Sequence, residues 1–151
     1  MAKSKTERIE LMKLPINPYS GIGPLRLGMS RDEVHRILGD HPKPFTKTTI
    51  SSTSTDAFPR LGIHVYYKES GSCTAIELME PAEPSFNGEL LIGKSFNKIR
   101  ALLEAKDKAL KVDASGFTSL ECGVGIYCPA AKDDPNAPVE GVIVFEKGYY
   151  D

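Results

Sequence analysis

Apolar residues recur three and four positions apart in two short segments of the chain, 25–39 and 90–104. This spacing places the apolar side chains along one side of a helix, which must bury that side against another element. Ser30 and Glu33 form a capping box at the first helix. The second helix keeps only the serine of that box and is expected to run to about Lys108.

The two segments align with a constant offset of 65 residues, in which a glycine, a capping serine and the apolar side of the helix coincide. Every matched position has a structural role in a turn, a cap or a core, so the alignment predicts two diverged tandem copies of one unit. The matched pairs are Leu25 with Leu90, Gly28 with Gly93, Ser30 with Ser95, Val34 with Ile99, Ile37 with Leu102 and Leu38 with Leu103.

Two strands are predicted after each helix, joined by segments rich in turn-forming residues. The strands are expected at 61–67, 73–80, 124–128 and 140–147. A further short strand is expected at 45–50, with a counterpart at 116–121. Each copy is therefore interpreted as a helix, a long connection and a β-hairpin.

These elements predict an α+β fold in which two tandem helix-plus-hairpin units form an antiparallel sheet with the helices on one face. A hairpin alone buries too little apolar surface to be stable, so the helices are expected to cover it. We divide the chain into an N-terminal extension at 1–19, a first unit at 20–84 and a second unit at 85–151, together forming one compact domain.

Side chains alternate between the two faces of a strand, so the sequence also predicts which residues point away from the helices. In the last strand, Ile143 and Phe145 are assigned to the helix side and Val144 to the opposite side. Exposed tyrosines supply stiff, amphipathic contact area for a protein partner, although half-exposed strands favour tyrosine in any case. The candidate partner-binding residues are His64, Tyr66, Glu77, Met79, Tyr127, Glu146, Tyr149 and Tyr150.

The composition narrows the function classes. The 151 residues are 40% hydrophobic and 26% charged with a net charge of −1, which is typical of a globular protein and offers no basic footprint for nucleic acid. No window approaches the ~20 apolar residues of a membrane span, and the N-terminal segment has no apolar signal core, so we expect no membrane partner and a cytoplasmic location.

The charge is unevenly spread along the chain. Residues 1–60 carry ten Lys/Arg against six Asp/Glu, whereas 61–151 carry nine against fourteen. The acidic excess of the second part is explained either by solvated surfaces or by docking of a basic protein partner.

The cysteines are predicted to be buried or half-buried free thiols. Their number, three, fits a reducing compartment better than a disulfide framework. If Cys122 and Cys128 lie on one extended strand, roughly 20 Å separates them. Disulfides need Cα atoms within about 7 Å, so these two cannot pair without a bend.

The sequence gives little support to catalysis. His35 is expected to face solvent, His41 lies in a loop, and only His64 is on a strand. The glycines at 21–23 lack the spacing of a phosphate-binding loop, and the acidic pair at 133–134 lacks the spaced ligands of a calcium loop. We therefore predict no catalytic residue, no cofactor and no metal, and a protein that is not an enzyme. The alternative is a small-ligand binder or enzyme that uses His64, Glu77 and Tyr127 as a polar cluster.

The run G-x-G-P-L-R-L-G-M-S-R-D-E-V-x-x-I-L-G at 21–39, followed by a strand pair, resembles the unit of β-lactamase-inhibitor-protein-like domains and small outer-membrane assembly lipoproteins. The resemblance covers about 20–147, although the second copy has drifted to IGKSFNKI. It implies a tandem fold whose sheet presents a concave surface to a protein.

The absence of an export signal and of a lipid-attachment cysteine favours a cytoplasmic member of this group. We therefore predict a non-catalytic inhibitor, specifically a bacterial immunity protein that neutralises an antibacterial toxin. An envelope assembly factor is the third hypothesis, and it predicts an export signal in the full gene.

Overall fold

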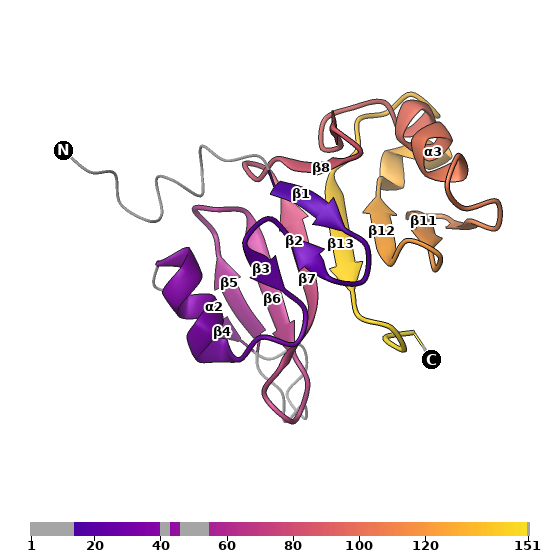
Figure 1. The fold of residues 1–151 in the computed structure, drawn as a ribbon. Helices are drawn as coiled ribbons and strands as arrows, with labels where there is room; N and C mark the ends of the chain where they lie inside the picture. Colours follow the sequence, from indigo (N-terminus) through magenta and orange to yellow (C-terminus); the bar gives the residue numbers. More distant parts are fainter. Residues whose placement is uncertain (1–13, 40–42, 46–54, 151) are drawn as a thin grey trace.

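The computed structural model describes residues 14–39, 43–45 and 55–150, which form an α+β fold rich in strands (Figure 1). The first half of the chain contains β1 (Leu14–Asn17), β2 (Gly21–Ile22), β3 (Leu25–Arg26), α2 (Arg31–Leu38), β4 (Lys43–Phe45), β5 (Thr55–Phe58), β6 (Ile63–Tyr67) and β7 (Cys73–Met79). The second half contains β8 (Pro84–Phe86), β9 (Glu89–Leu90), α3 (Phe96–Glu104), β10 (Lys111–Asp113), β11 (Gly116–Ser119), β12 (Val124–Tyr127), the short 3-10 helix η1 (Pro129–Lys132) and β13 (Gly141–Phe145). Neither described helix is long and apolar enough to cross a membrane.

Eight strands form one antiparallel sheet in the order β10-β11-β12-β13-β7-β6-β5-β4. Its central pair, β13 and β7, joins the two halves of the chain, and Figure 1 shows these two strands side by side. In this pair Ile143 lies opposite Glu77, and Val144 lies opposite Ile76. Directly opposite residues point to the same side of a sheet, so this register decides which side chains share a face.

A second, smaller sheet of five short strands has the order β3-β2-β1-β8-β9. Its strands β1 and β8 are parallel, and they also connect the two halves of the chain. Residues 14–17, which the sequence placed in the N-terminal extension, form β1 of this sheet. The prediction of one antiparallel sheet therefore missed the second layer, whose strands are too short to carry a readable hydrophobic period.

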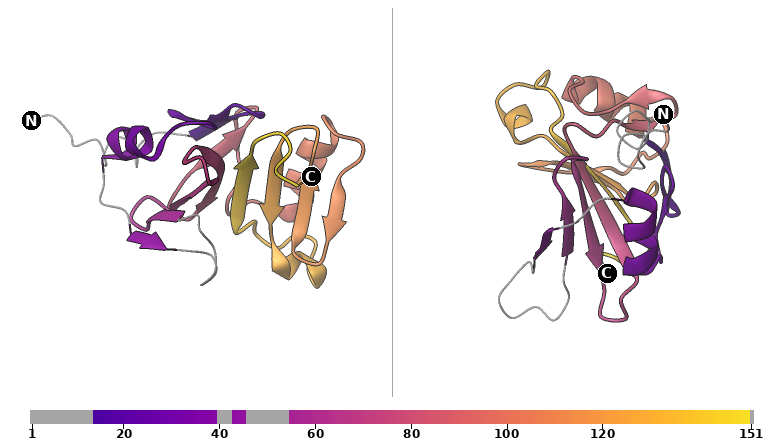
Figure 2. Two further views of the ribbon diagram at one scale, coloured as in Figure 1. Left: turned by 90° about the horizontal axis from the view of Figure 1, so that it is seen from below. Right: turned by 90° about the vertical axis from the view of Figure 1, so that its left-hand side faces the viewer.

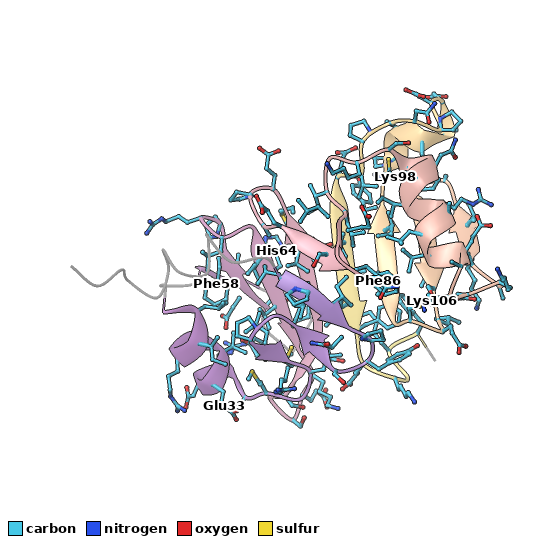
Figure 3. All side chains as sticks on the ribbon, turned by 45° about the horizontal axis from the view of Figure 1, so that its top comes forward. Glu33, Phe58, His64, Phe86, Lys98 and Lys106 are labelled. Atoms are coloured by element: carbon cyan, nitrogen blue, oxygen red, sulfur yellow. The ribbon has the colours of Figure 1, made fainter. Side chains whose placement is uncertain are left out.

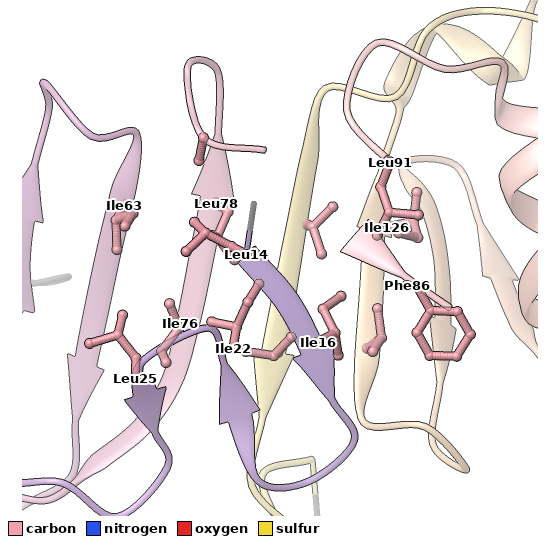
Figure 4. Close-up of a cluster of buried hydrophobic side chains, with 14 of the residues drawn as sticks. Leu14, Ile16, Ile22, Leu25, Ile63, Ile76, Leu78, Phe86, Leu91 and Ile126 are labelled. Atoms are coloured by element: carbon pink, nitrogen blue, oxygen red, sulfur yellow. The ribbon is translucent and has the colours of Figure 1, made fainter. Parts of the chain in front are cut away.

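The hydrophobic core lies between one face of the large sheet and the layer formed by the small sheet and the helices (Figure 2). Figure 4 shows Leu14, Ile16, Ile22 and Leu25 of the small sheet close to side chains of the large sheet such as Ile76. The apolar sides of both helices close the same core. Their buried residues are Val34, Leu38, Phe96, Ile99 and Leu103.

The first helix begins and ends as its sequence predicts. The Ser30 hydroxyl oxygen accepts a hydrogen bond from the Glu33 backbone N–H at 3.2 Å, and it lies 3.1 Å from the Glu33 carboxylate. Gly39 ends the helix with a φ of 64°, in the left-handed region that glycine adopts without steric cost. Sequence and structure therefore agree on α2.

The second helix begins differently. Ser95 does not cap it; instead its hydroxyl lies 3.2 Å from Asn136 Oδ1. The first backbone N–H groups, of Phe96 and Asn97, donate to the carbonyl oxygens of Ala137 and Pro135 at 2.9 and 3.0 Å. Carbonyl oxygens of the loop before β13 thus accept hydrogen bonds from the first amides of the helix, which a capping side chain would otherwise accept.

Helix α3 also ends at Glu104, so the expected extension to Lys108 is wrong. The reason lies at Asp107, whose carboxylate accepts hydrogen bonds from the Ala109 N–H and the Ser119 hydroxyl. These bonds hold the chain in a turn toward β10 and β11.

The predicted strands 61–67, 73–80, 124–128 and 140–147 correspond to β6, β7, β12 and β13 within two residues at either end. The strand expected at 116–121 is β11, whereas the segment 46–50 lies outside the described residues. Strand β10, and β5 before the first hairpin, were not predicted. Each helix is followed by four antiparallel strands of the large sheet, where the sequence predicted a hairpin and at most one further strand.

The assignment of faces in β13 is wrong. Val144 is 2% exposed and belongs to the core beside Val142, whereas Ile143 and Phe145 point to the opposite face. The error arose because β13 is apolar at every position after Gly141, so the strand carries no alternation from which a face can be read. In β6 the alternation is clear, and Ile63 and Val65 are buried as predicted.

Candidate protein-binding surface

The face of the large sheet opposite the core is not covered by either described helix, and we call it the outer face. Its residues follow from the alternation in each strand and the register between strands. From β6 to β11 the outer face carries His64, Tyr66, Ala75, Glu77, Met79, Ile143, Phe145, Gly125, Tyr127 and Thr118. It therefore brings together five of the eight candidate residues, from three different strands.

Glu77 organises the first half of this face. The Tyr66 hydroxyl donates to Glu77 Oε1 at 2.9 Å, and His64 Nδ1 lies 3.3 Å from the same oxygen. Burial, together with the negative charge of Glu77, raises the pKa of Tyr66 above its ordinary value of 10.0. The phenol therefore stays neutral and remains a hydrogen-bond donor. Figure 3 shows His64 on this half of the sheet.

A groove of about 220 Å³ crosses the second half of the outer face. Gly125 lines it, and the Ile143 side chain packs closely over this glycine, since a Cβ atom at position 125 would lie 2.8 Å from Ile143 Cγ2. The groove is smaller than the 300–1,000 Å³ typical of small-molecule pockets. Its outward-pointing lining is formed by Glu77, Asp113, Thr118, Gly125, Tyr127, Ile143 and Tyr150.

Residues 149 and 150 fold onto the outer face around Phe145. The Phe145 ring stacks on Tyr149 at 5.7 Å, meets Tyr150 edge-on at 4.9 Å and meets Tyr19 edge-on at 6.0 Å, and it is only 2% exposed. Burial raises the pKa of Tyr150, and the negative charges of Asp113 and Glu77 act in the same direction. Tyr150 therefore lies within electrostatic range of the two carboxylates that line the groove.

Glu146 contacts Thr74 and Lys68 rather than the other candidate residues. Its carboxylate accepts a hydrogen bond from the Thr74 hydroxyl at 2.8 Å and pairs with Lys68 Nζ at 3.1 Å. The register of β6 and β7 shifts beside Thr74, so the regular alternation of faces ends there. Through these two contacts Glu146 ties the end of β13 to β7 and to Lys68.

A polar cluster that the sequence did not single out lies under α2. Asp56 is 1% exposed, and its Oδ2 atom lies 2.6 Å from His35 Nε2 and 3.0 Å from the Tyr67 hydroxyl. Arg31 Nε is 3.6 Å from the same oxygen, and the guanidinium lies over the Tyr67 ring. The expectation that His35 faces solvent is therefore met only in part, because its side chain is 34% exposed while Nε2 turns to Asp56. The signal was the pair Arg31 and His35, which are four residues apart and so share one side of the helix.

All three cysteines are buried as free thiols, as predicted. Burial raises the pKa of Cys73 from its ordinary value of 9.0 to about 12, and it also raises the pKa of Cys128. A protonated thiol is a poor nucleophile and a poor metal ligand. Within the described part of the chain, no three His, Cys, Asp or Glu side chains are placed to share a metal ion. His41 lies outside the described residues.

No protein-family model matches this sequence, and comparison with curated proteins and with solved structures finds no significant match.

Proposed function

We propose that this chain is a non-catalytic protein-binding protein whose outer face covers a surface of its partner. The observation that carries the proposal is the composition of that face, where tyrosines, Glu77 and Ile143 lie on a sheet that neither described helix covers. Tyrosine is enriched at binding hot spots because it combines a large ring with a polar end and few rotatable bonds. Tyr127 and Tyr150 are 53% and 56% exposed.

The distribution of polar side chains favours binding over catalysis. The alternative function needs His64, Glu77 and Tyr127 in one cavity, yet the groove is lined by Glu77 and Tyr127 without His64. Because the groove is also small, an extended protein surface fits this face better than an enclosed ligand.

As the partner we propose an antibacterial toxin, which would make this chain a cytoplasmic immunity protein. The support is the resemblance of residues 21–39 to inhibitor-like domains, together with the acidic excess after residue 60. The binding experiment below tests the toxin assignment.

We also propose that the two halves are diverged copies of one unit. In support, the Gly28 N–H donates to the Cys73 carbonyl and the Gly93 N–H donates to the Val139 carbonyl, both at 2.8 Å. The two donors are 65 residues apart in the sequence, and the two acceptors are 66 residues apart. Gly62 and Gly123 precede β6 and β12 with φ angles of 71° and 70°. A shared architecture with different outer faces would leave binding specificity to the residues that the copies do not share.

The experiment measures binding to the product of a neighbouring reading frame by calorimetry. Tyr127→Ala is expected to weaken the complex at least tenfold, because a hot-spot truncation costs about 2 kcal/mol. Lys98→Ala on α3 is the matched control, since its side chain is exposed on the helix layer, and it is expected to leave the affinity unchanged. Equal affinities of wild type and Tyr127→Ala would contradict the proposal.

A further inference from the structure

Two carboxylates stand at opposite ends of the groove on the outer face. Glu77 lies on β7 and Asp113 at the end of β10, with β13, β12 and β11 between them. Glu77 Oε1 contacts Tyr66 and His64, and Asp113 Oδ1 accepts hydrogen bonds from the N–H and hydroxyl of Ser115. Among the described residues, no lysine or arginine forms an ion pair with either carboxylate. The one described titratable cation that pairs with either acid is His64, which contacts Glu77 and carries a charge only when protonated.

The surface between the two carboxylates suits a chain segment. Gly125 and the Ile143 side chain that packs over it both line the groove, and Ile143 offers an apolar contact there. The rings of Tyr127 and Tyr150 line the groove and remain more than half exposed. Aromatic rings attract guanidinium groups through the negative face of the ring and also pack on their aliphatic stems.

We infer that the groove binds an extended segment of the protein partner that carries arginine side chains, one at the Glu77 end and one at the Asp113 end. This inference rests on the proposed function and names the chemistry of the contact. Four strand spacings of about 4.8 Å separate β7 from β10, or about 19 Å in a flat sheet, which an extended chain spans in about five or six residues. The acidic excess of residues 61–151 attracts the same kind of partner from a distance.

The probe is a capped peptide of glycines with two arginines five positions apart, titrated into the full chain and followed by amide NMR signals. We expect the signals of Gly125, Tyr127 and Ile143 to shift in a saturable manner. The same peptide with citrulline in place of arginine keeps the shape and hydrogen bonding but lacks the charge, and it is expected to bind at least fivefold more weakly.

Two variants test the named carboxylates. Glu77→Gln and Asp113→Asn remove charge while keeping an acceptor oxygen, so the hydrogen bonds from Tyr66 and Ser115 persist. Each is expected to weaken the arginine peptide at least threefold. Glu140→Gln is the matched control, because Glu140 is an exposed acid of the same half outside the groove, and it is expected to leave binding unchanged.

Several results would overturn the inference. These are equal binding of the arginine and citrulline peptides, shifts confined to another surface, and a dimer in a sedimentation experiment that Tyr127→Ala dissociates, because a second copy would then cover the outer face. If the arginine peptide does not bind but Tyr127→Ala still weakens the complex with the protein partner, only the arginine preference is contradicted. If the peptide does not bind and Tyr127→Ala also leaves the complex unchanged, the proposed function is contradicted as well.

Discussion

The carboxylate of Asp56 lies 2.6 Å from Nε2 of His35, in a polar cluster buried between α2 and the large sheet. The second helix meets the sheet through a different kind of contact, in which the rings of Phe96 and Phe117 pack edge-on at 5.7 Å. Both helices bury apolar residues in the core, and α2 adds to this a polar cluster whereas α3 adds an aromatic pair.

The Asp56 cluster is expected to be a sensitive point for stability. Asp56→Ala leaves the Tyr67 hydroxyl, His35 and Arg31 without their shared acceptor, and breaking such a buried group of partners costs about 3 kcal/mol. Tyr67→Phe removes one hydrogen bond and is expected to cost about 1 kcal/mol. Urea denaturation monitored by circular dichroism measures both free energies of unfolding. A cost below that of Tyr67→Phe for Asp56→Ala would show that the cluster does not anchor α2.

Because α2 and α3 are capped differently, the same serine-to-alanine substitution at their first turns is expected to lower the free energy of unfolding by different amounts. Ser30→Ala removes the acceptor for the Glu33 N–H and is expected to cost about 1 kcal/mol. Ser95→Ala is the matched control, because backbone carbonyls already accept from the first amides of α3, so its cost is expected to be less than half as large. Equal costs in a denaturation experiment would contradict this account of the caps.

The buried carboxylate of Asp107 predicts acid sensitivity. Burial raises its pKa, but hydrogen bonds from the Ser119 hydroxyl and the N–H groups of Ala109 and Glu121 outweigh burial and place the pKa below the ordinary value of 3.8. The folded state thus favours the charged form, so its contribution to stability is present above pH 3.8 and is lost as the pH falls through the folded-state pKa.

Asp107→Asn is expected to lower the free energy of unfolding by about 1–3 kcal/mol at pH 7, since three donors lose a charged acceptor. The variant is also expected to lose less stability than wild type between pH 4 and pH 2. Parallel pH profiles of the two proteins would exclude this role for Asp107.

The buried Cys73 thiol is expected to make the folded protein less stable at alkaline pH. Its thiol ionises near 9.0 when unfolded but near 12 when folded, so only the unfolded state releases the proton between these values. The free energy of unfolding is therefore expected to fall as the pH rises above 9, with a slope for this group that approaches about 1.4 kcal/mol per pH unit above pH 10. Cys73→Ala is expected to remove about 1 kcal/mol of the decrease between pH 9 and 10. Identical slopes for the variant and wild type would refute the assignment.

The elements with a clear period were predictable from the sequence. Strand β6 alternates Ile63, His64, Val65 and Tyr66, and each side chain lies on the expected face. The apolar spacing of Val34 and Leu38 likewise identified α2 and its buried side. These patterns are local, so no information about distant partners was needed.

The remaining features depend on contacts between distant parts of the chain. Strands β1, β2 and β3 have only two to four residues each, and they exist because they pair with one another and with β8. The outer face places Ile143 beside Glu77 through a register that spans 66 residues of sequence. The Asp56 cluster likewise joins a strand to a helix 21 residues away. The spacing of apolar residues and the intrinsic preference of single residues for a helix or a strand carry no information on such pairings.

The central claim, that the outer face binds a protein partner, is tested most directly by site-specific photo-crosslinking in the cells that produce this protein. A photoreactive phenylalanine analogue replaces Tyr127 on the outer face in one variant and Lys98 on α3 in the other. The account predicts a discrete crosslinked species from position 127, which Glu77→Gln diminishes, and none from position 98. A crosslink from position 98 alone, or none from position 127, would contradict it.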